Sequence, residues 1–258
     1  MKKILIIPDV QRIYNTLHLI KKYDLGLESN DFMFARQLDD PEYCERTINS
    51  YKFFELPSFT TNHGAFIDVL PHSGDKKIKE VSLYRINQSI EMTRKIGAKS
   101  VVFHLNYNPF LNTEVYIEYF PKFCLDVWRP IIEENPDINF YIENMFEQDP
   151  YLIKRVAKEL SVYDNFGLCL DWGHAALSKT NPMIWAEELK EYVKHIHLND
   201  NNLKVDQHLG WGRGQINRLQ FYNCYDRFLN NATILIETIL FEEQKASFRQ
   251  LEEDGFLK

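Results

Sequence analysis

Short apolar runs in this sequence end in side chains that can bind a metal ion. The residues that close six of these runs are His63, His104, Glu143, Asp171, His197 and Glu237. An apolar strand has no structural need for a polar terminus of this kind, and burying imidazoles together with carboxylates is costly unless a cation neutralises them. We therefore expect these side chains to form a metal site where the ends of the runs meet.

Three further candidate ligands lie just beyond such runs. His174 follows Asp171 in the segment Leu-Asp-Trp-Gly-His, and Asp206 and His208 form an Asp-x-His pair in a glycine-rich loop. This spacing puts two ligands on one side of an extended segment. Mixed imidazole and carboxylate ligation suits Zn²⁺, Mn²⁺ or Fe²⁺. Nine ligands would serve two or three ions that share a carboxylate. If the three later residues bind substrate instead, one or two ions remain, so we expect one to three ions per chain.

The apolar runs themselves predict β-strands, because each is short and rich in Val, Ile, Leu and Phe, as a strand buried on both faces is. The predicted strands are Ile4–Ile7, Phe59–His63, Ser100–His104, Asn139–Glu143, Phe166–Asp171, Val193–His197 and Thr233–Glu237, with a weaker one near Gly26–Glu28. Amphipathic stretches predict helices at Asp75–Ile96, Glu114–Glu134, Pro150–Leu160, Pro182–Tyr192, Ile216–Leu229 and Glu242–Leu251. Such alternation indicates a parallel sheet, and in 258 residues it favours a single α/β domain, a (β/α)8 TIM barrel over residues 1–258.

Barrel enzymes carry their catalytic groups at the C-terminal ends of the strands, which is where the candidate ligands fall. Two long stretches without helical periodicity, Ser29–Thr47 and Asn199–Gln215, are expected to be loops over that face. We expect His195 to be structural and to face away from His197. Glu147 is expected to be an exposed residue at the start of a helix.

Composition excludes several classes of protein. The formal net charge of −7 disfavours a basic nucleic-acid footprint, although bound cations would change the local sign. No stretch reaches the roughly 20 apolar residues of a membrane span, and the first apolar run is too short for a signal peptide. The four cysteines are far apart and form no CxxC pair, so we expect free thiols in a cytoplasmic protein.

The residues that carry the predicted chemistry also carry a family resemblance, from about Phe59 to Glu237. The matching segments are HGAFID (63–68), VVFH (101–104), IEN (142–144), LDWGHA (170–175), HIHLND (195–200), DQHLGWGRG (206–214) and LIET (235–238). Together they resemble the xylose isomerase-like TIM barrel superfamily, in the branch shared by endonuclease IV-type AP endonucleases (AP endonuclease family 2) and sugar-phosphate isomerases and epimerases.

The resemblance implies three ion sites. In the endonuclease pattern one ion would be held by His63, His104 and Glu143, a second by Glu143, Asp171, His197 and Glu237, and a third by His174, Asp206 and His208. The single-metal sugar epimerases resemble only the second of these sets. The ligand count therefore favours a multinuclear centre.

The loops favour sugar chemistry. The segment after His63 resembles sugar-phosphate isomerases, and the acidic Ser29–Thr47 stretch is a poor surface for gripping phosphates. The leading hypothesis is a metal-dependent isomerase or epimerase of a sugar or sugar phosphate, in which Glu143 and Glu237 move a proton through an enediolate. The candidates for substrate contact are Arg213, Trp172, Trp211 and Asn144. The alternative for the two tryptophans is packing under a loop, and for Asn144 it is orientation of a ligand or capping of the backbone.

Two alternatives remain open. The first is an AP endonuclease or other phosphodiesterase with a trinuclear zinc site, for which DNA would be the partner. The second is a catalytically silent barrel that only binds metal or ligand.

Overall fold

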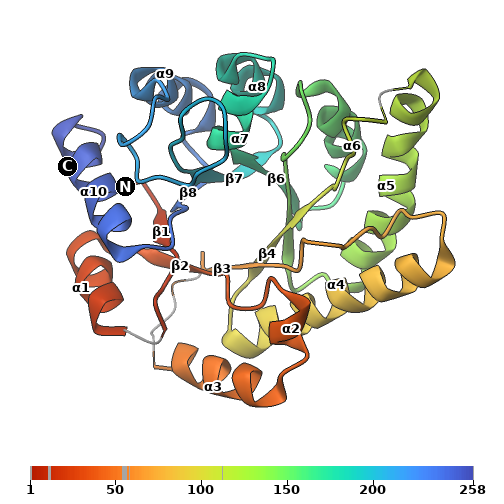
Figure 1. Cartoon of the computed structure of the whole chain (residues 1–258), viewed down its shortest axis with the longest axis horizontal. Helices are drawn as coiled ribbons and strands as arrows, with labels where there is room; N and C mark the ends of the chain where they lie inside the picture. Colours follow the sequence, from red (N-terminus) through yellow and green to blue (C-terminus); the bar gives the residue numbers. More distant parts are fainter. Residues whose placement is uncertain (1, 11–12, 54–56, 58, 112, 258) are drawn as a thin grey trace.

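The strands form a closed barrel in which each one pairs in parallel with its neighbours, in sequence order from β1 to β8 and back to β1. This computed structural model describes residues 2–10, 13–53, 57, 59–111 and 113–257. The strands are β1 (Ile4–Ile6), β2 (Gly26–Ser29), β3 (Thr61–His63), β4 (Ser100–His104), β5 (Asn139–Glu143), β6 (Phe166–Asp171), β7 (Val193–Leu198) and β8 (Thr233–Ile236). Figure 1 looks into the barrel and shows the helices arranged around the ring of strands. The predicted TIM barrel is confirmed.

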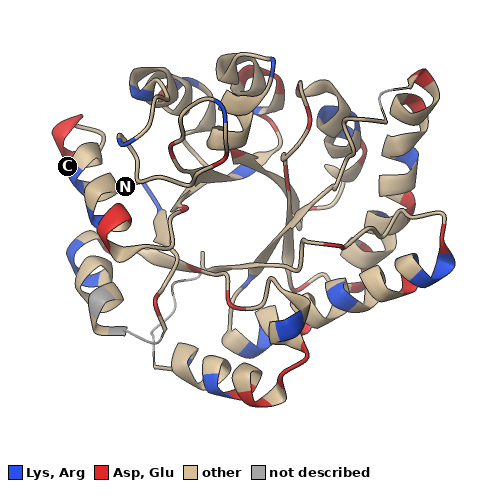
Figure 2. Ribbon diagram, viewed as in Figure 1, with Lys and Arg blue, Asp and Glu red and all other residues tan. Residues whose placement is uncertain are grey.

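Helices follow the strands and cover the outside of the barrel. They are α1 (Ile13–Tyr23), α2 (Ala35–Leu38), α3 (Pro41–Tyr51), α4 (Lys76–Ile96), α5 (Glu114–Glu134), α6 (Tyr151–Leu160), α7 (Trp172–Leu177), α8 (Pro182–Leu189), α9 (Arg218–Cys224), the π-helical turn η1 (Tyr225–Leu229) and α10 (Phe241–Glu253). Side chains cap several of these helices. At the start of α4, for example, the Asp75 side chain accepts a hydrogen bond from Lys77 N. Gly97 ends the same helix in the left-handed backbone conformation, with φ 83°. Acidic and basic residues are interspersed along these outer helices (Figure 2).

The prediction of a loop over Ser29–Thr47 was wrong, because α2 and much of α3 lie there. The Asp40 side chain accepts from Tyr43 N and Pro41 occupies the first turn, which is a strong local start signal for α3. The helix buries only Cys44, Thr47 and Tyr51, so its apolar stripe is too sparse to show as a clear period in the sequence.

Most of the hydrophobic core lies between the strands and the helices. A smaller cluster of Leu5, Ile7 and Leu235 lies apart from it. All four cysteines are unpaired, as predicted, and all four are buried. Among the described residues, none of the helices is both long and apolar enough to cross a membrane.

Candidate metal centre

Six of the predicted ligands lie together at the C-terminal ends of the strands and are all buried. We call this set the inner group: His63, His104, Glu143, Asp171, His197 and Glu237. Four of them are the last residues of β3, β4, β5 and β6, His197 is the next to last of β7, and Glu237 follows β8 directly. Because alternate strand residues point into the barrel, closure of the sheet brings these side chains to one place.

The Glu143 carboxylate lies at the centre of the inner group. Its Oε2 atom is 3.0 Å from His104 Nε2 and 3.7 Å from His63 Nε2. Its Oε1 atom is 3.2 Å from His197 Nδ1, which is also 3.3 Å from Glu237 Oε1. Potential ligand atoms of His63, His104 and Glu143 lie within 4.8 Å of one another, as do those of Glu143, Asp171, His197 and Glu237. Glu143 therefore belongs to both sets of potential ligands.

The remaining three predicted ligands form what we call the outer group: His174, Asp206 and His208. Their potential ligand atoms also lie within 4.8 Å of one another. Asp206 Oδ2 is 3.2 Å from His174 Nε2 and 3.0 Å from His208 Nε2. His174 belongs to α7, and at the start of this helix the Asp171 side chain accepts a hydrogen bond from His174 N. The Nδ1 atom of His174 is 3.6 Å from Glu143 Oε1. The outer group therefore borders the inner one.

The loop that carries Asp206 and His208 is anchored by Asp200, a buried residue that the sequence analysis did not single out. Its carboxylate accepts backbone hydrogen bonds from Gly212, Gly214 and Ile216. A Cβ atom at position 214 would lie 2.3 Å from Asp200 Oδ1, so this close approach requires glycine. In the sequence, the closely spaced glycines of this segment indicate a tightly folded loop, but they do not identify Asp200 as the residue that holds it.

The electrostatics of the cluster fit bound cations. Burial, together with the charges of Glu237 and Glu143, raises the pKa of Asp171 to about 8. The Glu237 charge raises the pKa of His208 to about 10, against burial. The Glu143 Oε2 and His104 Nδ1 atoms are buried without a hydrogen-bond partner among the described residues. The packed carboxylates favour positive charge on the neighbouring imidazoles, and some buried polar atoms have no hydrogen-bond partner. Bound divalent ions would neutralise the carboxylates and coordinate these atoms.

Four of the histidines have one ring nitrogen facing the carboxylate of a predicted ligand and the other facing an acceptor. In His208, Nε2 lies 3.0 Å from Asp206 Oδ2 and Nδ1 lies 3.3 Å from the Glu237 carbonyl oxygen. His63 Nδ1 lies 2.9 Å from the Gly64 carbonyl oxygen, and His174 Nδ1 lies 2.9 Å from the Asn144 carbonyl oxygen. In His197 the order is reversed, since Nδ1 faces Glu143 and Nε2 lies 3.0 Å from Glu28 Oε1. Glu28 is fully buried, and the sequence analysis placed it in a strand without assigning it a role. Opposing the effect of burial, His197 and His195 hold the pKa of Glu28 below its usual range.

A cavity of about 340 Å³ opens above the ligands. Besides seven of the nine predicted ligands, it is lined by Asn30 and by apolar side chains, namely Ile7, Met33, Phe34, Phe66, Met145 and Ile239. The Phe66 ring contacts His63 and His104, with centroid distances of 5.7 and 5.3 Å. None of the described residues that line this cavity is Lys or Arg.

The four side chains predicted to contact substrate lie elsewhere. Trp172 and Trp211 are fully buried, and both rings pack against Phe221. Arg213 is half exposed and forms a 2.6 Å ion pair with Glu243. The Asn144 side chain bonds the backbone of Asp171 through both its amide nitrogen and its oxygen. The structure brings none of them into the lining of the cavity.

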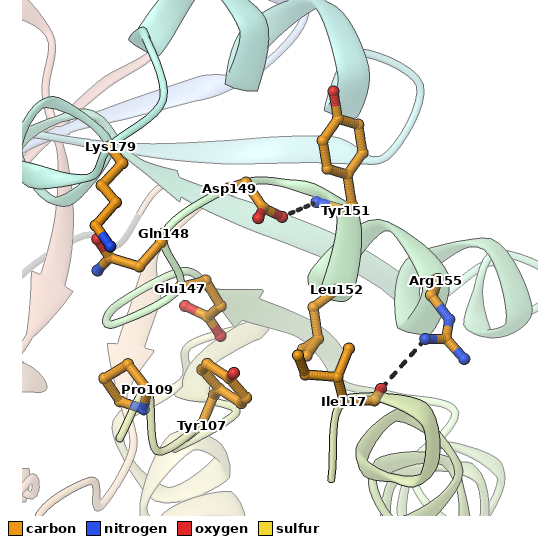
Figure 3. A pocket seen from close by; sticks show the side chains of 10 residues that line it. All are labelled: Tyr107, Pro109, Ile117, Glu147, Gln148, Asp149, Tyr151, Leu152, Arg155 and Lys179. Carbon is orange, nitrogen blue, oxygen red and sulfur yellow. Dashed lines mark hydrogen bonds between the residues drawn. The ribbon is translucent and has the colours of Figure 1, made fainter. Parts of the chain in front are cut away.

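Two expectations about neighbouring residues were wrong. His195 does not face away from His197, because residues two apart on a strand share a face, and its Nε2 lies 3.0 Å from Glu28 Oε2. Glu147 is buried rather than exposed, and accepts from Met145 N. Its carboxylate points toward the Tyr107 ring in a separate pocket between α5 and α6 (Figure 3).

Comparison with known proteins agrees with this architecture. A family model described as "Xylose isomerase-like TIM barrel" matches residues 30–230. The uncharacterized protein MJ1614 of Methanocaldococcus jannaschii is 30% identical over 183 residues, covering 69% of each chain. A probable endonuclease 4 of Ureaplasma parvum is 24% identical over 253 residues, covering 85% of this chain and 81% of the relative.

Solved structures superpose over almost the whole chain. A D-tagatose 3-epimerase-like protein has a TM-score of 0.77 at 22% identity and covers 97% of this chain and 96% of its own. The TTHB071 protein from Thermus thermophilus, soaked with ZnCl₂, has a TM-score of 0.75 at 20% identity, with coverages of 98% and 97%. At these identities the likeness establishes the fold.

Proposed function

Because the chain belongs to the xylose isomerase-like TIM barrel family, we propose that it is a divalent-metal-dependent isomerase or epimerase of a small sugar or sugar phosphate. The observation that carries this proposal is that two carboxylates from different strands of the barrel lie close to the same imidazole nitrogen. Glu143 Oε1 and Glu237 Oε1 lie 3.2 and 3.3 Å from His197 Nδ1, and they come from separate parts of the barrel, at the ends of β5 and β8.

This arrangement suits proton transfer between neighbouring carbons. Glu143, Asp171, His197 and Glu237 would hold an ion, which when bound supplies Lewis-acid stabilisation of the negative charge that develops on substrate oxygens. A carboxylate on one side of the substrate then takes a proton from carbon, and a carboxylate on the other side returns one. Glu143 and Glu237 are the two groups that fill these roles.

The cavity supports a small substrate. Its volume of about 340 Å³ is at the lower end of the range for small-molecule sites. Phe66 and Phe34 provide an apolar wall against which the carbon face of a sugar packs. A protein that grips duplex DNA relies on Lys and Arg contacts to phosphates, and the described residues that line this cavity contribute none.

The outer group favours a second candidate function, phosphoester hydrolysis. His174, Asp206 and His208 add a third cluster beside the two that share Glu143. Bridged ions activate water and neutralise a leaving oxygen in such reactions. Glu143 would then act as a bridge between ions and not as a base.

A solvent-exchange experiment separates the two functions. Metal-loaded protein is incubated in D₂O with aldoses, ketoses and their phosphates, and deuterium at carbon is followed by NMR. Sugar chemistry predicts deuterium incorporation that is lost in Glu237→Gln. Absence of exchange and turnover across the panel, combined with chelator-sensitive cleavage of bis(p-nitrophenyl) phosphate or of an abasic duplex, would replace the first function with the second.

A further inference from the structure

Beneath the inner group, the barrel interior holds a second layer of polar side chains. Glu28 of β2 and His195 of β7 are both fully buried there, and Thr61 of β3 is 1% exposed. His195 and Thr61 stand two positions before the predicted ligands His197 and His63 on the same face of their strands, and Glu28 directly precedes Ser29, the last residue of β2. A buried carboxylate in this position needs donors, and each of its neighbours supplies one.

The contacts of Glu28 divide between its two oxygens. Oε2 accepts from the Thr61 hydroxyl and lies 3.0 Å from His195 Nε2. Oε1 lies 3.0 Å from His197 Nε2. Both Oε1 and His197 Nε2 are buried, and neither meets hydrogen-bond geometry with any group in the described part of the chain, so their 3.0 Å contact is a close charge pair rather than an aligned hydrogen bond. At that distance Glu28 Oε1 is the carboxylate oxygen that faces His197 Nε2.

We propose that Glu28 is a positioning residue that holds the proton of His197 on Nε2, and so leaves the Nδ1 lone pair directed at the ion held by Glu143, Asp171, His197 and Glu237. This inference rests on the metal binding proposed above. A neutral imidazole carries one proton and one lone pair. With the proton on Nδ1, the Nε2 lone pair would face a carboxylate oxygen at 3.0 Å and Nδ1–H would face the ion, so Glu28 excludes that tautomer.

Three other histidines of the candidate centre provide an internal comparison. His63, His174 and His208 present Nε2 to carboxylates of predicted ligands, and each has Nδ1 beside a backbone carbonyl oxygen. Backbone carbonyls come with the fold, whereas His197 depends on one particular side chain from β2, a strand that is distant from β7 in the sequence. The orientation of the His197 proton therefore depends on the side chain at position 28.

The first test measures metal binding in Glu28→Gln, with Glu147→Gln as the matched control. The control makes the same substitution at another buried carboxylate, which accepts from Met145 N and lies outside the polar layer around His197. In Glu28→Gln we expect binding of the inner ion to weaken by about 10- to 100-fold, the usual effect of losing such a partner, while the ion of the outer group is retained. Glu147→Gln is expected to bind as the wild type does. Wild-type affinity in a folded Glu28→Gln protein would overturn the proposal.

The second test needs no substitution. In zinc-loaded wild-type protein labelled with ¹⁵N-histidine, long-range ¹H–¹⁵N NMR reports which ring nitrogen carries the proton. We expect Nε2–H for His197 and Nδ1–H for His63 and His174. A proton on Nδ1 of His197 would overturn the proposal even if the variants fail to fold. Wild-type protein that takes up no divalent ion would contradict the proposed function itself, which is a different result from either of these.

Discussion

The inner and outer groups of the metal centre are built in different ways. Inner ligands stand on or directly after strands, and none is more than 6% exposed. In the outer group, the Asp206 and His208 side chains are each 35% exposed and belong to a loop. The inner geometry follows from the hydrogen-bonded barrel, whereas the outer geometry depends on the few contacts that fold that loop. The barrel itself therefore fixes the positions of the inner candidate ligands, whereas the positions of Asp206 and His208 are conditional on the fold of one loop.

This difference bears on the choice of reaction. Both carboxylates proposed for proton transfer, Glu143 and Glu237, belong to the inner group, so the proposed sugar chemistry requires only that group. Hydrolysis by a trinuclear site needs the outer group as well. Experiments that remove one group and leave the other therefore test both the comparison and the function.

The largest effect is expected from Glu143→Gln, which removes the carboxylate shared by the inner ligands. This substitution removes a proposed base and weakens the binding of an ion that contributes several kcal/mol of charge stabilisation. We therefore expect turnover to fall by about a thousandfold or more. Measurement of kcat and of bound metal checks this. Glu134→Gln, an exposed residue at the end of α5, is the control for charge loss. Turnover within tenfold of the wild type would show that the inner group is not the reaction centre.

Stepwise removal of metal is expected to show that the inner and outer groups bind their ions with different strength. Ions that bind only the folded state stabilise it by about 2.7 kcal/mol at 100 times their Kd, which for a domain of this size raises Tm by roughly 5–10 °C. Because the outer group is more exposed, we expect graded EDTA treatment to remove its ion first and to leave part of the stabilisation. Thermal unfolding combined with metal analysis follows the two stages. A single step in which all ions leave together would remove the distinction between the groups.

The next effect is expected from Asp200→Ala, which leaves the backbone N–H groups of Gly212, Gly214 and Ile216 without their acceptor. We expect a loss of about 2–3 kcal/mol of unfolding free energy and loss of the outer ion, with the inner ion retained. Asp206→Asn is the control, since it removes an outer ligand while the loop keeps its anchor. Retention of the outer ion in Asp200→Ala would show that the loop is held by other contacts.

The smallest effect is expected from Arg213→Ala. Its ion pair with Glu243 is half exposed, so we expect the free energy of unfolding to fall by less than about 1 kcal/mol. Since Arg213 does not line the cavity, KM should stay close to the wild-type value, for a phosphorylated substrate as well as for a neutral one. An increase in KM confined to phosphorylated substrates would instead place an anion site at this exposed rim of the loop.

Local pattern predicted much of the fold. The strands Ser100–His104, Asn139–Glu143 and Phe166–Asp171 were predicted with their observed bounds, because a strand buried on both faces is a continuous apolar run with polar residues at its ends. The short β1 and β3 were predicted too long. The helix α3 was missed because its start signal, Asp40 and Pro41, precedes a stripe of few buried residues.

Sequence alone determined where the inner ligands lie, since a ligand at the end of each parallel strand reaches the same mouth in any closed barrel. Only the tertiary structure decided that Trp172 and Trp211 pack inward, that Asp200 holds the outer loop, and that Glu28 contacts His197. These are contacts between residues far apart in the chain. Their existence depends on strand register and loop closure, which hydrophobic periodicity does not encode.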